Sequence, residues 1–345
     1  MSDVNSEHNS HVAPDQMSAD PAPIRRAYDL NGVTLAVAAA EERPAAFLDP
    51  ILAPLRCATP SECDWVISLS PSATIEPPTS GHRIFEGPLP EGLSSVMVKD
   101  GDERILVVPG HFDMRFRRAV RTTEIRFVPG KEGGLGGTAA FWMLDDLLAA
   151  YGRHLLHGAL LVDPATDRSI VLFAPSGTGK STTALALARI GFCLAGDDAL
   201  VLDTSEDEPS VWAIPRKIKV HRQTAALLPW LGPILTDTWT DDEQPFELGA
   251  LSGVVALSTP KRRRAELVIA LMPPNERGHA VTRIAKPEAL AVIACDNLRI
   301  APNGVDTDDT AALSALARLI ATTPVIALSV GPDPASLSRD LIGLR

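Results

Sequence analysis

The stretch that most constrains the fold is residues 171–198, in which an apolar run, a glycine-rich turn and a helical pattern follow one another directly. The apolar residues Ile170–Phe173 predict a buried strand. The alanine- and leucine-rich segment 181–190 predicts a short helix that ends at Gly191. A strand, a glycine-rich loop and a helix in this order are typical of a phosphate-binding P-loop. The sequence therefore predicts a nucleotide site.

The residue types in this loop fit the chemistry of a bound phosphate. Gly177 and Gly179 have no Cβ, so the backbone can curl and point successive N–H groups at one anion, with the positive end of the helix behind them. Lys180 adds a point charge for the outer phosphates, and the Ser181 hydroxyl suits Mg²⁺. The predicted nucleotide-binding residues are Pro175, Ser176, Gly177, Thr178, Gly179, Lys180, Ser181 and Thr182.

One position of the loop departs from the usual pattern G-x-x-x-x-G-K-[ST], because Ala174 stands where the first glycine is expected. The alternative is an ordinary turn between strand and helix, with a solvated Lys180. That alternative leaves the glycines, lysine and serine unexplained, so we favour the nucleotide site.

A second polar motif follows the predicted helix. The apolar segment that begins at Phe192 is interrupted by Asp197 and Asp198. A strand that stops at paired carboxylates suits an element that contacts a metal bound to phosphate. The alternative is a simple turn after a strand.

With these residues identified, the segment from about 157 to 202 resembles the catalytic domain of the HPr serine kinase/phosphorylase family. The resemblance is carried by His157-Gly158 before an apolar strand, by the loop 175–181, and by Gly191 ahead of the strand closed by Asp197-Asp198. It implies an α/β (α+β) fold with a P-loop core related to that of phosphoenolpyruvate carboxykinase. It also implies transfer of phosphate from ATP to a serine hydroxyl of a protein.

The resemblance assigns roles to individual residues. Lys180 and the loop amides are expected to bind the triphosphate, and Ser181 and Asp197 to hold Mg²⁺. Asp198 matches the base that faces the acceptor hydroxyl, and His157 matches an active-site histidine; which of the two aspartates is base and which is metal ligand stays open. His157 could instead close a helix and bond a carbonyl.

Three basic residues after this segment, Arg216, Lys217 and Lys219, alternate with apolar residues along a predicted strand. They either line a face toward phosphate or an acidic peptide, or form a solvent-facing edge.

The chain lacks the glycine-rich acidic signature that HPr enzymes carry downstream of this aspartate pair. The resemblance is closer to HPr-kinase-related proteins found beside lasso-peptide genes, some of which phosphorylate a serine of a precursor peptide. We therefore predict an ATP- and Mg²⁺-dependent serine kinase acting on a protein or peptide. The alternatives are a small-molecule phosphotransferase on the same fold and a catalytically silent nucleotide-binding regulator.

The pattern of apolar runs and breakers predicts a disordered tail over 1–24, a β-rich amino-terminal domain over 25–130 and a catalytic domain over 138–345. Thr138 is predicted as the N-cap of a helix that leads into the catalytic domain. Strands are expected at 33–37, 65–69, 105–108, 124–128, 246–257, 266–272 and 325–330, and helices at 138–151, 222–231, 286–294, 308–320 and 334–344.

Composition excludes several partners. The net charge of -11 argues against nucleic acid as a partner. No apolar run is long enough to span a membrane. The four cysteines, Cys57, Cys63, Cys193 and Cys295, form no C-x-x-C pair, so we expect reduced core thiols, no metal cluster and a cytoplasmic location. A homo-oligomer stays open.

Overall fold

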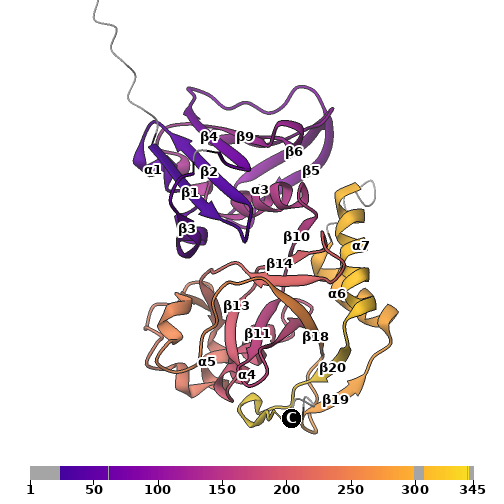
Figure 1. Cartoon of the computed structure of the whole chain (residues 1–345). Helices are drawn as coiled ribbons and strands as arrows, with labels where there is room; N and C mark the ends of the chain where they lie inside the picture. The colour runs from indigo at the N-terminus through magenta and orange to yellow at the C-terminus, as the bar shows by residue number, and fades with distance from the viewer. Residues whose placement is uncertain (1–23, 61, 299–306, 340, 342–345) are drawn as a thin grey trace, which may run out of the picture.

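The computed structural model describes residues 24–60, 62–298, 307–339 and 341, and shows a mixed α/β molecule built on two large sheets (Figure 1). The amino-terminal sheet is the upper one in Figure 1, and the second sheet lies below it. The predicted tail lies outside the described residues except for Ile24, which begins the first strand.

The amino-terminal sheet has nine strands in the order β3-β1-β2-β4-β9-β8-β7-β6-β5. Its pairs are antiparallel except for β2 with β4 and β4 with β9. The predicted strands at 33–37, 65–69, 105–108 and 124–128 are confirmed. The strands are β1 (Ile24–Asp29), β2 (Thr34–Ala39), β3 (Arg56–Cys57), β4 (Trp65–Pro71), β5 (His82–Pro88), β6 (Ser94–Asp100), β7 (Glu103–Val108), β8 (Phe112–Arg117) and β9 (Thr122–Phe127).

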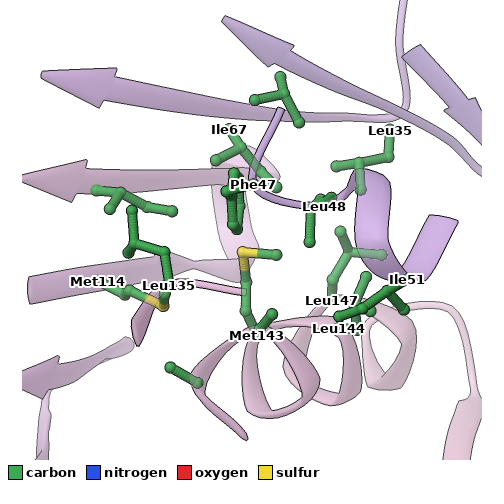
Figure 2. Close-up of a cluster of buried hydrophobic side chains, with 14 of the residues drawn as sticks. Leu35, Phe47, Leu48, Ile51, Ile67, Met114, Leu135, Met143, Leu144 and Leu147 are labelled. Atoms are coloured by element: carbon green, nitrogen blue, oxygen red, sulfur yellow. The ribbon is translucent and has the colours of Figure 1, made fainter. Parts of the chain in front are cut away.

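One face of this sheet is covered by helices. The short helices α1 (Glu42–Ala45) and α2 (Asp49–Leu52) and the longer α3 (Thr138–Ala149) pack there. Figure 2 shows side chains of α3, among them Met143 and Leu144, pointing at the strands. The prediction of Thr138 as an N-cap is wrong: Gly137 takes that position, and Thr138 is the first helical residue, its hydroxyl donating to Glu91 at 2.9 Å.

The second sheet carries the predicted loop and aspartate pair. Its strand order is β10-β14-β15-β18-β12-β11-β13, with β20 paired to β18 and β19 to β20. The strands β12, β18 and β20 run parallel. The strands are β10 (Arg153–Leu156), β11 (Ala159–Asp163), β12 (Arg168–Phe173), β13 (Cys193–Asp197), β14 (Leu200–Asp203), β15 (Ser210–Ala213), β18 (Arg263–Met272), β19 (Ala280–Arg283) and β20 (Val325–Ser329).

Helices cover both faces of the second sheet, because alternate residues of a strand point to opposite faces. Ile170 and Leu172 of β12 pack with α4 (Lys180–Arg189). Val171 and Phe173 share a cluster with α6 (Lys286–Asn297) and α7 (Thr307–Thr322). Beside this sheet, β16 (Ile218–His221) and β17 (Glu243–Phe246) form a separate hairpin, and α5 (Arg222–Leu227) follows β16.

Two of the predicted elements in this half are wrong. In place of a strand over 246–257, β17 ends at Phe246 and a single 3-10 turn spans Leu248–Leu251. The buried residues here, Phe246, Leu251 and Val255, are five and then four positions apart, which does not keep the two-residue alternation of a half-buried strand. In place of a helix over 334–344, the described residues form one 3-10 turn at Pro334–Ser336, after which Leu337 is buried in an extended conformation.

The cysteines also differ from the expectation of core thiols. Cys57 and Cys295 are exposed, Cys63 and Cys193 are half-buried, and all are free. Within the described ranges, every helix is too short or too polar to cross a bilayer.

The two sheets are joined by direct contacts. Trp212 and Ile214, from the second half, are buried in the same cluster as the amino-terminal sheet and α3. The guanidinium group of Arg153 on β10 donates to the Leu30 carbonyl at 2.8 Å. The domain boundary at residue 138 stays a prediction, but the apolar side chains of α3 pack on the amino-terminal sheet.

Candidate active site

The glycine-rich loop (174–179) connects the end of β12 to the first residue of α4. Gly177 and Gly179 have φ angles of 76° and 94°, in the left-handed region that glycine adopts without steric cost. No atom lies within 4 Å of a Cβ built on either glycine, so the backbone conformation and not crowding requires glycine there. The Thr178 amide donates to the Pro175 carbonyl at 3.1 Å and closes the turn.

A cleft of about 310 Å³ opens beside this loop. Every predicted site residue lines the cleft except Thr178. The other walls come from the β16–β17 hairpin and the start of α5. The lining residues are His157, Ala174, Pro175, Ser176, Gly177, Gly179, Lys180, Ser181, Thr182, Asp197, Asp198, Lys219, His221, Gln223, Thr224 and Glu243.

The floor of the cleft is the ion pair between Lys180 and Asp197. Lys180 Nζ lies 2.5 Å from Asp197 Oδ1, and the two side chains are only 8% and 3% exposed. Lys180 is the first residue of α4 and Asp197 the last of β13, so adjacent elements bring them together. Removing either partner of such a pair would leave a buried charge without compensation, which is costly.

Asp198 follows Asp197 directly and lies closer to solvent, in the part of the cleft that we call its mouth. Its φ angle of 77° is left-handed, which is uncommon for a residue with a Cβ and turns the chain sharply after β13. Its carboxylate lies 2.9 Å from His157 Nε2, 2.5 Å from Arg216 Nη1 and 4.0 Å from Lys180 Nζ. The side chain is 36% exposed, so it is the more accessible of the two carboxylates.

The surroundings of Asp198 keep it ionised. Burial by itself raises the pKa of this carboxyl group. The hydrogen bond from His157 and the positive charges of Arg216 and Lys180 outweigh burial and hold the pKa of Asp198 well below its usual range. The carboxylate therefore accepts hydrogen bonds at neutral pH without carrying a proton itself.

His157 is held by the last turn of α6, which the sequence did not connect with the site. Its backbone N–H donates to Asn297 Oδ1 at 2.6 Å, and its Nδ1 lies 3.7 Å from Asp296 Oδ2. That Asp296 oxygen is buried and has no hydrogen-bond partner among the described residues. The helix predicted over 286–294 ended before both residues, and no local pattern links them to position 157.

The three basic residues at 216, 217 and 219 have separate environments. Arg216 contacts Asp198, and its guanidinium carbon lies 4.4 Å from the centre of the Phe141 ring. Lys219 lines the cleft and lies 3.5 Å from Glu243, whereas Lys217 faces Glu247 at 3.1 Å. Arg216 and Lys217 precede β16, so the predicted strand is wrong for these two residues, and Lys219 alone of the three lines the cleft.

The residues present can hold Mg²⁺ only together with phosphate. Among the described residues no group of three His, Cys, Asp or Glu side chains is arranged to bind a metal ion. Mg²⁺ usually needs one or two protein oxygens beside waters and substrate phosphates. Ser181 and Asp197, which both line the cleft, meet that requirement. Thr182 is less suited to coordinate the metal, because its hydroxyl group already contacts the Thr224 hydroxyl group at 2.8 Å.

Comparisons with known proteins add little to this geometry. No protein-family model matches the chain, and no curated protein matches it. Among solved structures, the chain is similar to the Hpr(Ser) kinase/phosphatase from Coxiella burnetii, with 18% identity over 38% of this chain and 78% of that chain, and a TM-score of 0.24. At this identity and score, the likeness decides neither the fold nor the function of the chain.

Proposed function

We propose that this protein is an ATP- and Mg²⁺-dependent kinase with a P-loop core that phosphorylates a serine hydroxyl of a protein or peptide. One observation carries the proposal: a loop with two left-handed glycines, a buried lysine and two differently placed aspartates share one cleft. Phosphoryl transfer needs positioning and charge neutralisation more than covalent chemistry. This set of residues can supply both.

In the proposed reaction, the glycine-rich loop and the floor residues Lys180 and Asp197 bind the phosphates and the metal. The loop amides and the start of α4 favour an anion, and Lys180 neutralises charge on the outer phosphates. Ser181 and Asp197 would hold Mg²⁺, and a cation bound there would supply positive charge to offset the charge of the phosphates. Lys180 contacts Asp197 at 2.5 Å. Binding of nucleotide and metal would therefore bring the phosphates to Lys180 and the metal to Asp197, either with this ion pair kept or with the two side chains separated.

In the proposed reaction, Asp198 contacts the serine hydroxyl that accepts the phosphoryl group. Because its pKa is lowered, Asp198 is a weak base. Its main role is to accept a hydrogen bond from the serine hydroxyl and to orient that oxygen toward the phosphoryl group. A loose transition state needs little deprotonation of the nucleophile before transfer. This interpretation favours Asp197 as the metal ligand and Asp198 as the residue that faces the acceptor.

The size and depth of the cleft support a large acceptor. Its volume of about 310 Å³ is at the lower end for small-molecule pockets, so a nucleotide leaves little room for a second enclosed ligand. The acceptor-facing residue is also the exposed one. A serine presented from outside, on a protein or a precursor peptide, fits this arrangement better than a small molecule.

The proposal is tested by incubating the purified full-length chain with ATP, Mg²⁺ and a library of serine-containing peptides. The products are analysed by mass spectrometry. We expect phosphate on serine in a subset of peptides, and no phosphate when Mg²⁺ is chelated. Phosphorylation of small metabolites alone supports a small-molecule phosphotransferase, and ATP binding without any transfer supports a silent regulator.

A further inference from the structure

Helix α3 lies between the two sheets and contacts both, on different sides (Figure 1). Met143, Leu144 and Leu147 are fully buried on the amino-terminal sheet. Phe141 and Asp145, four positions apart and therefore on one side of the helix, contact residues of the second half instead.

These two contacts lead to two of the partners of Asp198. The guanidinium carbon of Arg216 lies over the Phe141 ring, 4.4 Å from its centre. Asp145 Oδ1 accepts the backbone N–H of Leu155 at 3.2 Å, on the strand that leads directly to His157. Arg216 and His157 in turn hold Asp198 at 2.5 and 2.9 Å. Lys180 and Asp197, by contrast, are paired with each other at 2.5 Å.

We infer that α3 makes the amino-terminal half part of the active site, with Phe141 as a positioning residue that orients Arg216 and, through it, Asp198. An arginine side chain has many rotamers, and one carboxylate contact fixes only one end of the guanidinium group. An aromatic face fixes its plane as well, and such contacts contribute more when they are partly shielded from water. The inference rests on the proposed kinase function.

The expected consequence is specific to the transfer step. Loss of the ring leaves the charge of Arg216 in place but frees its plane, so Asp198 is held less accurately against the acceptor. Misplacement of a reacting group by about 1 Å can reduce a rate about a hundredfold. Nucleotide binding depends on the loop and on Lys180, which α3 does not position.

The test compares Phe141→Leu with Trp142→Leu in the full-length protein. Both residues are aromatic, partly buried and adjacent on α3, but Trp142 packs edge-on against Phe85, with the ring centroids 5.0 Å apart, on the amino-terminal half. We expect Phe141→Leu to lower kcat about ten- to a hundredfold with the ATP KM nearly unchanged. Trp142→Leu should lower kcat no more than about twofold. Phe141→Tyr, which keeps the aromatic ring, should have nearly the kcat of the wild type.

A second measurement is independent of catalysis. The Arg216 side-chain Nε–H resonance, assigned with Arg216→Lys, should show the upfield ring-current shift of a stacked guanidinium group, lose it in Phe141→Leu and keep it in Phe141→Tyr. Equal kcat losses in Phe141→Leu and Trp142→Leu, or an unaltered Arg216 resonance in Phe141→Leu, would overturn the inference. If the wild-type protein transfers no phosphate, the proposed function fails, and the resonance alone decides whether Phe141 positions Arg216.

Discussion

The floor and the mouth of the cleft are built in different ways. At the floor, Lys180 and Asp197 are nearly inaccessible and come from two elements joined by one short connection. At the mouth, Asp198 is more than one-third exposed, and its partners His157 and Arg216 contact Asn297 and Phe141, which lie far from Asp198 along the chain. The comparison indicates that a compact local unit binds the phosphates, whereas the whole tertiary structure places the acceptor-facing carboxylate.

The largest expected effect comes from the floor. Lys180→Ala removes the charge that neutralises the outer phosphates and leaves Asp197 buried without its partner. We expect ATP affinity, measured by calorimetry, to fall at least about a hundredfold, since removing one charged partner of a buried contact at a binding site costs about 2–5 kcal/mol of binding free energy. Lys217→Ala is the matched control, because Lys217 is half exposed and faces Glu247. Unchanged ATP affinity in Lys180→Ala would contradict the assignment of the loop.

The next effect separates the mouth from the floor. Asp198→Asn keeps the shape of the side chain but weakens its hold on the acceptor hydroxyl. We expect phosphate transfer to fall about a hundredfold or more, in the range seen for loss of a general base, while ATP binding persists. Loss of both ATP binding and phosphate transfer would instead indicate that Asp198 is a metal ligand. The proposed difference in role between Asp197 and Asp198 would then be wrong.

A smaller effect is expected from α6, which supports the mouth from outside. Asp296→Asn removes the carboxylate that lies 3.7 Å from His157 Nδ1. We expect kcat to fall about tenfold, as losses of outer partners of a functional histidine often do, with ATP affinity unchanged. Asp207→Asn serves as control, since Asp207 is fully exposed and does not line the cleft. Equal activity of both variants would show that His157 needs no support from Asp296.

The smallest effect concerns stability, on the strand that leads to the mouth. His154 on β10 is buried, and burial lowers its pKa below the usual 6.5 despite the nearby Asp145. The unfolded chain therefore binds a proton more readily, so the stability associated with neutral His154 is complete above about pH 6.5 and is lost as the pH falls.

Urea unfolding between pH 7 and pH 5 measures this effect. We expect His154→Gln to reduce the pH dependence of the free energy of unfolding by at most about 1.4 kcal/mol per pH unit. The same slope in the wild type and in His154→Gln would show that His154 does not sense the change in pH.

The sequence predicts the floor better than the mouth for a physical reason. A strand, a glycine turn and a helix are local features, so the loop, Lys180 and the strand to Asp197 follow from adjacent residues. The contacts of Asp198 with Arg216, of Arg216 with Phe141 and of His157 with Asn297 depend on which faces of distant elements meet. The hydrophobic periodicity of a single sequence does not show which faces of distant elements meet.

The same reason explains the wrong elements. The strands of the amino-terminal sheet have clear alternation, as in β4, where Trp65, Ile67 and Leu69 are buried and the residues between them exposed. The segment 246–257 is largely apolar without alternation, and only Phe246, Leu251 and Val255 in it are buried, Leu251 at the end of a 3-10 turn. Apolar content alone therefore did not distinguish a strand from a packed loop.

The central claim is that the loop and both aspartates serve one metal-bound triphosphate. A crystal structure with a non-hydrolysable ATP analogue and Mg²⁺ tests it most directly. We predict the phosphates against the amides of residues 175–180, the metal about 2.1 Å from Ser181 Oγ and from Asp197 or a water bound to it, and Asp198 facing the terminal phosphate. A nucleotide bound outside this cleft, or an Asp198 turned away from its terminal phosphate, would contradict the account.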